Sequence, residues 1–268
     1  MFEQFFNLLH TPFGRDVPPD ALYSTPKCGE LQARLLYVAK SRKFCVVTGD
    51  VGVGKTTAMR KFASSLDPSL FRHVYISDSA LTPRVFYWEV LKAFANLEKP
   101  PLYRSDGKHK MMLALENMLE SRQTPIIIID EAHLLSHEML EETRFLLNYK
   151  MDSQNPMALV IVGQSELRGR LSKELYEPIC QRVDFRFKLP PFDRAQTQDY
   201  IAAHMAFAGE ARQIFTDSAI SAVFGYSGGY ARKINKVCTL ALMTAAQQNN
   251  RAIEESIVSF VVEQELEW

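Results

Sequence analysis

The segment 49–56 constrains this chain more than any other. It runs Gly-Asp-Val-Gly-Val-Gly-Lys-Thr and matches the pattern Gly-x-x-x-x-Gly-Lys-Ser/Thr at every fixed position. An apolar run, 44–48, leads directly into it, and a segment with helical spacing, 55–66, follows it. Glycines let backbone N–H groups converge on an anion, and the N-terminus of the next helix adds positive potential there. The segment is therefore predicted to be a phosphate-binding loop between a buried strand and a helix.

Two side chains of this loop have specific expected roles. Lys55 is expected to contact the β- and γ-phosphates of a nucleotide, and Thr56 is expected to ligate Mg²⁺. ATP and Mg²⁺ are the expected cofactors. A glycine-rich turn with an incidental lysine is the alternative, and the flanking strand and helix disfavour it. The loop residues predicted to bind the nucleotide are Gly49, Asp50, Val51, Gly52, Val53, Gly54, Lys55, Thr56 and Thr57.

Two adjacent carboxylates, Asp130 and Glu131, follow a run of isoleucines at 126–129. Such a run is typical of a central parallel strand that is buried on both faces. Side chains alternate along a strand, so the two carboxylates are expected to point in different directions. Asp130 is predicted to bind Mg²⁺, and Glu131 is predicted to be the base that polarises the attacking water. A strand that ends in two solvated acids is the alternative.

Three polar positions are further candidates for the same reaction. Gln164 follows an apolar run and is predicted to orient the water or touch the γ-phosphate, with Ser165 as the alternative. Arg182 precedes a fifth apolar run and is predicted to reach the γ-phosphate of a neighbouring subunit, with Arg186 as the alternative. Arg232 opens a helix after two glycines and is predicted to contact the phosphates of its own subunit. Each of the three could instead be an ordinary surface residue.

Strand-like and helix-like segments alternate up to about residue 190, and only helical segments follow. The expected strands are 44–48, 73–76, 125–129, 158–162 and 183–189, and the expected helices between them are 55–66, 83–97, 108–120 and 139–149. The later helices are expected at 194–208, 216–227, 232–249 and 253–265. Asp193 and Asp217 are expected near N-caps, and Gly209 is expected at a C-cap. The alternation predicts an α/β domain with a mostly parallel sheet flanked by helices, residues 1–190, and an all-α domain, residues 191–268.

Composition excludes few functions. The 31 basic residues balance the 31 acidic ones, so any binding to nucleic acid must come from a local patch. The cysteines, at 28, 45, 180 and 238, form no Cys-x-x-Cys pair, which argues against a zinc site or a disulfide framework. The N-terminus lacks the basic start and apolar stretch of a signal peptide, and no apolar run is long enough to span a bilayer. A cytoplasmic protein with no membrane anchor is therefore expected.

These motifs, in this order, resemble the AAA+ superfamily of P-loop NTPases over nearly the whole chain. The resemblance implies a parallel sheet flanked by helices, with a C-terminal all-α lid. Several stretches are similar, more narrowly, to the ExeA/GspA-type ATPases and to the transposition-associated ATPases grouped with TnsC, MuB and IstB. The stretches are 5–6, 11–13, 47–52, 130–135, 139–142, 145–148 and 162–167. The resemblance implies that Pro12 and Phe13 contact the adenine. Gln164 departs from the Asn or Thr that is common in AAA+ proteins and agrees with this narrower group.

The resemblance also implies a task. Secretion proteins resembling ExeA carry a membrane segment and a cell-wall-binding region beyond the ATPase, and this chain ends at Trp268 with neither. The expectation is therefore a transposition regulator, an ATPase that forms a homo-oligomeric ring or filament on double-stranded DNA and recruits or stimulates a transposase. The alternatives are an ExeA-like secretion or assembly ATPase and a slow ATP-dependent signalling switch.

The short basic segment 103–110 is the candidate DNA contact. It is expected to be a loop leading into a helix, in which Arg104, Lys108 and Lys110 contact phosphates beside an aromatic residue. Arg84, at the start of the preceding helix, is a further candidate. A solvated run of charges is the alternative. His133 is expected to pack or to form a hydrogen bond, because no second His or Cys stands at metal-ligand spacing.

Overall fold

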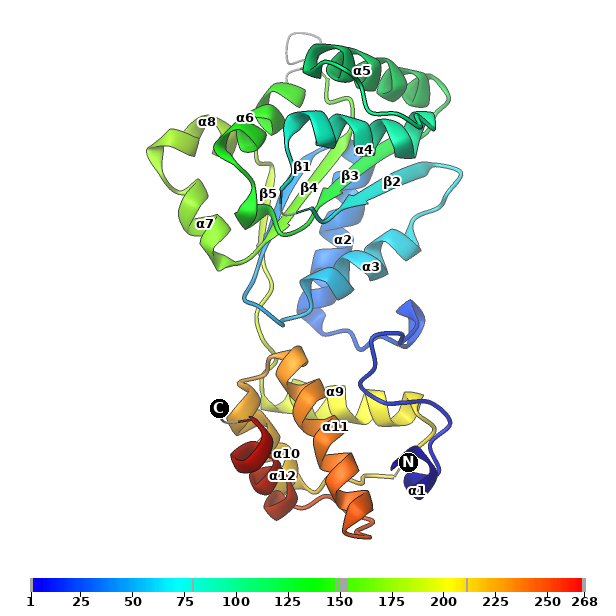
Figure 1. Ribbon diagram of the computed structural model, residues 1–268, viewed down its shortest axis with the longest axis vertical. Helices are drawn as coiled ribbons and strands as arrows, with labels where there is room; N and C mark the ends of the chain where they lie inside the picture. The colour runs from blue at the N-terminus through cyan, green and yellow to red at the C-terminus, as the bar shows by residue number, and fades with distance from the viewer. Residues whose placement is uncertain (1, 79, 148, 150–153, 211, 267–268) are drawn as a thin grey trace. The chain divides into compact units, whose positions relative to one another are not determined.

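The structure is a computed structural model that describes residues 2–78, 80–147, 149, 154–210 and 212–266 (Figure 1). The chain forms two compact units, which are described one at a time. The sheet unit contains Cys28–Gly49 and Ala58–Leu189. The helical unit contains Met1–Lys27, Asp50–Thr57 and Pro190–Trp268.

The sheet unit is built on a five-stranded sheet in the order β2-β3-β4-β1-β5, and every neighbouring pair is parallel. The strands are β1 Phe44–Thr48, β2 Phe71–Ile76, β3 Thr124–Ile129, β4 Ala158–Gly163 and β5 Phe185–Lys188. The predicted parallel sheet is therefore confirmed, and each expected strand is present. β2 starts two residues earlier than predicted, because Phe71 and Arg72 pair with Thr124 and Pro125.

Burial along the strands explains this order. β1 and β4 are buried at every position, and β3 at every position after its first, as their continuous apolar sequences require. β2 and β5 are the edge strands, and buried residues alternate with more exposed ones along them. The three apolar strands therefore occupy the centre of the sheet.

Helices cover both faces of the sheet, with α4 on the near face and α2 on the far face in Figure 1. The helical elements around the sheet are α2 Pro26–Ser41, α3 Lys55–Ser65, α4 Pro83–Ala95, α5 Arg104–Glu120, η2 Ala132–Leu134, α6 His137–Leu146, α7 Ser165–Leu171, η3 Glu174–Tyr176 and α8 Glu177–Cys180. One core cluster packs Ile127 and Ile129 of β3 against Phe86 of α4 and Leu115 of α5. The predicted sheet flanked by helices is thus observed.

Several helices differ from the expectation, which did not include α7, α8 or the N-terminal helix Phe2–Phe6. α2 was not predicted, although Pro26 at its start and the buried positions Leu31, Leu35 and Val38 follow a helical period. α5 starts at Arg104 rather than at Lys108. The segment expected to be a basic loop, 103–110, is therefore mostly the first two turns of a helix, and the expectation of a loop was wrong.

The helical unit contains α9 Arg194–Phe207, α10 Asp217–Ser227, α11 Ala231–Gln247 and α12 Glu255–Val261, which continues as the π-helical η4 Val262–Leu266. Asp193 caps α9 in a capping box with Gln196, as expected. Gly209 follows α9 with a φ of 94°, which suits a glycine after a helix C-cap. The cap of α10 is Thr216, and Asp217 is its first helical residue.

N-terminal residues complete the core of the helical unit. The short helices α1 Phe2–Phe6 and η1 Pro19–Ala21 belong to it. Phe2, Phe6 and Phe13 lie in one cluster with Ile201 and Phe215. The unit therefore joins segments that are almost 200 residues apart, and the division into domains 1–190 and 191–268 stays a prediction.

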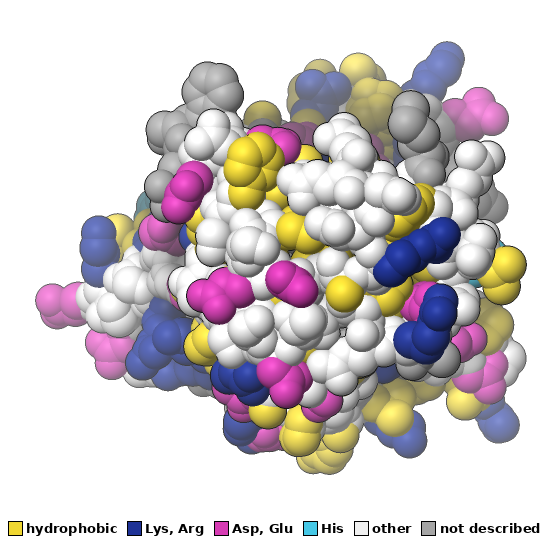
Figure 2. All heavy atoms as spheres, turned by 90° about the horizontal axis from the view of Figure 1, so that it is seen from below, with side chains coloured by type: hydrophobic (Ala, Val, Ile, Leu, Met, Phe, Trp, Pro, Cys, Tyr) yellow, Lys and Arg dark blue, Asp and Glu magenta, His cyan; other side chains and the backbone are white. Residues whose placement is uncertain are grey.

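Figure 2 shows the face of the molecule seen from below, where basic and acidic side chains are interspersed among polar and apolar ones. The mixture agrees with the neutral formal charge of the chain. Over the described residues, no helix combines the length and the hydropathy that a membrane span requires.

Candidate nucleotide site

The phosphate-binding loop has the backbone that its glycines predict. It connects the end of β1 to the start of α3 at Lys55. Gly52 and Gly54 have φ values of 83° and 98°, a region that glycine enters without steric cost. A Cβ atom added at Gly54 would meet no atom within 4 Å, so this side of the loop is open to a ligand.

The lysine and threonine of the loop differ in exposure. Lys55 is 8% exposed, and its Nζ donates to the carbonyl oxygen of Asp50 at 3.0 Å. Thr56 is exposed on the first turn of α3. The ammonium group therefore lies over the loop, and Thr56 lies at the surface. An open glycine-lined loop with a lysine above it fits a nucleotide phosphate.

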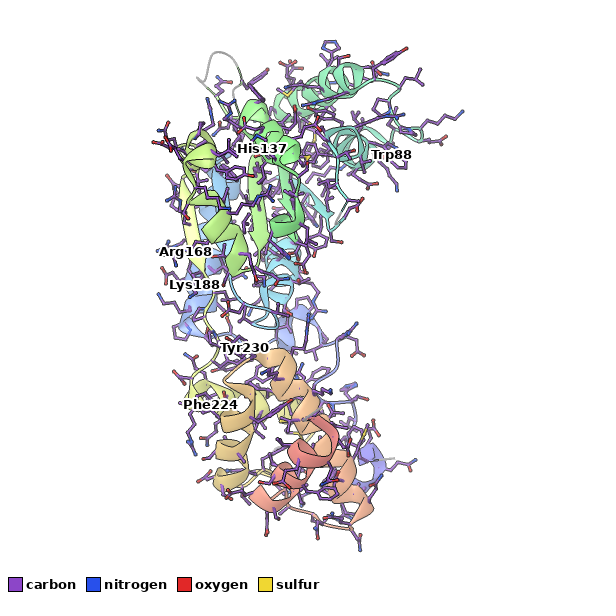
Figure 3. All side chains as sticks on the ribbon, turned by 60° about the vertical axis from the view of Figure 1, so that its left-hand side comes forward. Trp88, His137, Arg168, Lys188, Phe224 and Tyr230 are labelled. Atoms are coloured by element: carbon purple, nitrogen blue, oxygen red, sulfur yellow. The ribbon has the colours of Figure 1, made fainter. Side chains whose placement is uncertain are left out.

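The start of α11 contacts this loop within the helical unit. The backbone N–H of Arg232 donates to the carbonyl oxygen of Gly52 at 3.1 Å, and Gly52 approaches the Cβ of Arg232 closely. Tyr230, labelled at the beginning of α11 in Figure 3, donates its hydroxyl to Oδ2 of Asp50 at 3.1 Å. This hydrogen bond raises the pKa of Tyr230. Arg232 thus lies beside the loop, as its predicted role requires, and Tyr230 is a contact that sequence reasoning missed.

The carboxyl ends of β1, β3 and β4 lie at one edge of the sheet. Ile129 pairs with Ile161, and Thr48 pairs with Gly163. Asp130 follows β3, Gln164 follows β4, and the loop begins at Gly49 after β1. These polar residues therefore leave the sheet at nearly the same level, as parallel strands require. Ligands of open α/β sheets bind at this type of edge.

Each carboxylate oxygen of Asp130 accepts a hydrogen bond at this edge. Its side chain is buried, and its Oδ2 accepts from the hydroxyl of Tyr75 on β2 at 2.6 Å. Its Oδ1 accepts from the backbone N–H of Glu131 at 2.7 Å. Tyr75 is a second contact that sequence reasoning missed, since no local pattern distinguishes it from other aromatic strand residues.

Glu131 adopts a left-handed backbone, with φ 51° and ψ 33°. This region is uncommon for a residue with a side chain and marks a local cost in energy. β3 ends two residues earlier, at Ile129. The side chain of Glu131 is 46% exposed, whereas Asp130 is 2% exposed. The two carboxylates therefore differ in direction and surroundings, as a metal ligand and a base would.

The two candidates after β4 occupy adjacent positions at the start of α7. Gln164 is the N-cap residue, and its side chain makes no capping hydrogen bond. Ser165 is the first helical residue. The amide of Gln164 is therefore not committed to the helix, and the choice between Gln164 and Ser165 stays open.

Arg182 and Arg186 lie toward the opposite edge of the sheet. Asp184, just before β5, pairs through its backbone and carboxylate with Phe44 at the amino end of β1. Arg182 precedes it in a turn, and Arg186 on β5 donates to the carbonyl oxygen of Cys180 at 2.9 Å. Arg182 is thus at the edge opposite Asp130, and its action on another subunit stays a prediction.

Pro12 and Phe13 are buried. The backbone N–H of Phe13 donates to Nδ1 of His204 at 3.2 Å, and the two rings stack with centroids 5.2 Å apart. Burial lowers the pKa of His204 to about 4, so the imidazole is neutral and Nδ1 can accept. His204 is a further residue that sequence reasoning missed. The contact of Pro12 and Phe13 with adenine stays a prediction.

The candidate DNA contacts are engaged within the sheet unit. Arg104 forms ion pairs with Glu138 and Glu142, and Lys108 pairs with Glu142 at 3.1 Å. Lys110 pairs with Asp106 at 2.9 Å. Arg84 donates to the carbonyl oxygen of Pro101 at 2.8 Å.

Glu142 is the common partner of Arg104 and Lys108 on α5. Its side chain is buried and also accepts from the hydroxyl of Tyr87. Burial acts to raise the pKa of Glu142, but hydrogen bonds from Tyr87, Arg104 and Lys108 hold it below its ordinary value. These two cations therefore compensate a buried charge. They have a structural role whether or not they also contact DNA.

No group of three or more His, Cys, Asp or Glu side chains capable of holding a metal is found among the residues that the structure describes. All four cysteines are free thiols.

The fold and the loop define the class of protein. Residues 38–171 match the family described as AAA domain, and the chain belongs to this family. The chain is 30% identical over 266 residues to general secretion pathway protein A of Aeromonas hydrophila. That alignment covers 97% of this chain and 47% of the relative, so the chain spans about half of the relative's length.

Solved structures share the fold. Drosophila ORC bound to DNA has a TM-score of 0.73 at 17% identity, covering 100% of this chain and 66% of that one. Cdc6p from Pyrobaculum aerophilum has a TM-score of 0.66 at 17% identity, covering 94% and 68%. The RuvB branch-migration motor of Thermotoga maritima has a TM-score of 0.60 at 19% identity, covering 88% and 67%. At these identities the likeness establishes an AAA+ fold alone.

Proposed function

We propose that this chain binds ATP with Mg²⁺ and hydrolyses it as part of a homo-oligomer. The observation that carries the proposal is the shared sheet edge: the loop starts at Gly49 where Asp130, Glu131 and Gln164 leave the neighbouring strands. Phosphate binding and water activation both need groups that converge on one place, and the carboxyl edge of a parallel sheet provides it.

The residues divide the work as follows. Lys55 and the loop N–H groups bind the β- and γ-phosphates, while Thr56 and Asp130 supply the hard oxygen ligands that Mg²⁺ prefers. When bound, Mg²⁺ neutralises charge on the phosphates. Glu131 takes a proton from water as the water oxygen attacks the γ-phosphorus and the bond to the bridging oxygen breaks. Gln164 orients that water.

Two exchanges test the reaction itself. Glu131→Gln should lower kcat by roughly 10²–10⁴-fold, because the amide cannot accept the proton, while ATP affinity persists. Lys55→Ala should weaken ATP binding directly. Steady-state ATPase rates and titration with a fluorescent ATP analogue measure the two effects. Unchanged nucleotide binding in Lys55→Ala would contradict the proposal.

The oligomer is tested through Arg182. Its placement opposite Asp130 supports a role on a neighbouring subunit, where it would stabilise charge in the transition state. Arg182→Ala should lower kcat by roughly 10³-fold or more with little change in ATP affinity, and Arg186→Ala is the matched control. Mixing Arg182→Ala with Glu131→Gln should restore activity, because some interfaces then combine an intact base with an intact arginine. Two inactive variants that stay inactive when mixed would exclude action between subunits.

For the task of the ATPase we propose regulation of transposition, with assembly on double-stranded DNA and recruitment of a transposase. The stretches similar to the ATPases grouped with TnsC, MuB and IstB support this proposal. ATPase rates at low salt, with and without double-stranded DNA, test it, and stimulation should decline with salt because the contacts are to phosphates. Arg84 and Lys110 are the first residues to replace with alanine in a DNA-binding assay, because neither of them pairs with the buried Glu142. Arg104→Ala and Lys108→Ala also remove partners of the buried Glu142, so their DNA binding must be compared with their thermal stability.

The curated relative favours a second candidate. General secretion pathway protein A aligns over 97% of this chain, which supports a task in the assembly of a secretion apparatus. This candidate predicts an ATPase rate that DNA does not change. Absence of DNA binding with a non-hydrolysable ATP analogue would exclude the transposition task and leave the secretion task. A turnover too slow to measure, despite tight ATP binding, would instead favour a signalling switch.

A further inference from the structure

The two carboxylate oxygens of Glu131 differ in their surroundings. The side chain as a whole is 46% exposed, but Oε2 is buried and accepts no well-formed hydrogen bond. The nearby basic group is Nδ1 of His133, at 3.4 Å. This nitrogen is also buried and has no other hydrogen-bond partner. Two buried polar atoms that lie 3.4 Å apart and have no hydrogen-bond partner are costly unless they interact.

The position of His133 is determined by its backbone. It lies in the single turn η2, directly after Glu131 and beside the end of β4. A Cβ atom added at Gly163 would come within 3.2 Å of the backbone nitrogen of His133 and 2.7 Å of a side-chain carbon of Leu167, so a larger residue there would require its neighbours to shift. Arg170 of α7 donates to the carbonyl oxygens of His133 and Leu135. The ring, 12% exposed, is therefore held between elements that carry the site.

We propose that His133 is a positioning residue for the catalytic base Glu131. In the tautomer with a proton on Nδ1, His133 donates to Oε2 and anchors one oxygen of the carboxylate. Oε1 is then the oxygen that receives the proton from the attacking water. This inference rests on the proposed ATPase function.

Paired variants of His133 test the inference in the full chain. His133→Ala should lower kcat on the order of 10- to 100-fold with little change in KM for ATP, as loss of an outer partner of a catalytic group does. His133→Asn should recover most of the rate, because its side-chain amide can occupy the place of Nδ1. In the Glu131→Gln background, His133→Ala should have no further effect. Comparison of thermal midpoints and ATP affinities verifies that each variant folds.

The outcomes separate the inference from the function on which it rests. A wild-type chain that hydrolyses ATP, with a His133→Ala variant of equal kcat, would overturn the inference alone. An equal loss in His133→Asn and His133→Ala, or an equal loss with and without Glu131, would assign His133 a structural role and also overturn it. A wild-type chain that binds ATP but does not hydrolyse it would overturn the proposed function and the inference together.

Discussion

The sheet unit and the helical unit build their cores in different ways. The sheet unit consists of residues 28–189 without Asp50–Thr57, which belong to the helical unit. Three apolar strands form its centre. The helical unit draws on three separate segments, and its aromatic cluster needs Phe2, Phe6 and Phe13 from the opposite end of the chain. A core of contiguous segments can be predicted from periodicity, whereas one of distant segments cannot.

The units also handle buried ionisable groups differently. In the sheet unit, Glu142 stays charged because Tyr87, Arg104 and Lys108 donate to it. In the helical unit, His204 lies against Phe13 and Tyr200, and burial favours its neutral form. A buried charge needs charged or hydrogen-bonding partners, whereas a buried base avoids the cost of a charge by staying neutral above its pKa. The two units should therefore respond differently to mutation and to acid.

The largest expected effect tests the origin of the helical core. Phe6→Ala should destabilise the helical unit by about 3–5 kcal/mol, because it removes a buried ring that α9–α12 cannot replace. Amide hydrogen exchange measured by segment should show faster exchange in α9–α12 and little change in β1–β4. Ile127→Ala, at a fully buried site of the sheet, is the matched control and should show the reverse. An equal loss of protection in both units after either exchange would mean that they unfold together.

Acid should weaken the helical unit before it affects Glu142. The pKa of His204 is about 4 in the folded chain and 6.5 in the unfolded one, so the unfolded state binds more protons below pH 6.5. Its stabilising contribution is complete above pH 6.5 and falls by about 3 kcal/mol by pH 4. The pKa of Glu142 is lowered, so its contribution is lost only below its ordinary value of 4.5.

Urea unfolding between pH 7 and pH 4.5 measures this difference. His204→Phe should flatten the dependence on pH, whatever its effect on stability at pH 7. Burial also lowers the pKa of His73 on β2, so His73→Gln is the necessary control for the sheet unit. A pH dependence that disappears in His73→Gln and persists in His204→Phe would contradict the assignment.

A smaller effect on stability is expected at Asp193, the N-cap residue of α9. Asp193→Ala removes the side-chain oxygen that accepts from the backbone N–H of Gln196 in the capping box of α9, and should destabilise the helical unit by about 0.5–2 kcal/mol. Thermal unfolding followed by circular dichroism measures the loss. Asp193→Asn keeps a capping oxygen and should retain most of the stability. An asparagine variant as unstable as the alanine variant would indicate a role other than capping.

The smallest expected effect concerns the contact between α11 and the loop. Tyr230→Phe removes one hydrogen bond to Asp50 and should cost about 0.5–1.5 kcal/mol, either in stability or in ATP affinity. A double-mutant cycle with Asp50→Asn measures the coupling between the two side chains. Additive effects of the two exchanges would show that the hydrogen bond does not contribute.

Much of the fold could be predicted because its signals are local. The glycine loop, the isoleucine run before Asp130 and the helical period of the C-terminal segments each depend on neighbouring residues. Where a local signal was weak, the prediction failed: α2 was missed, and α5 was started four residues too late at Lys108. Arg104 and Lys108, in the first two turns of α5, were expected in an exposed basic segment, whereas in the structure both pair with Glu142.

The sequence by itself determined the residue types and the order of the candidate site, from the loop to Asp130, Glu131 and Gln164. Only the tertiary structure decided which side chains support them: Tyr75 for Asp130, His133 for Glu131, and Tyr230 for the loop. It also decided that Phe13 is held by His204. The physical reason is the distance along the chain over which each feature is determined. A motif is set by covalent spacing and backbone geometry, whereas a partner from another element is set by packing and by the need to satisfy buried polar groups.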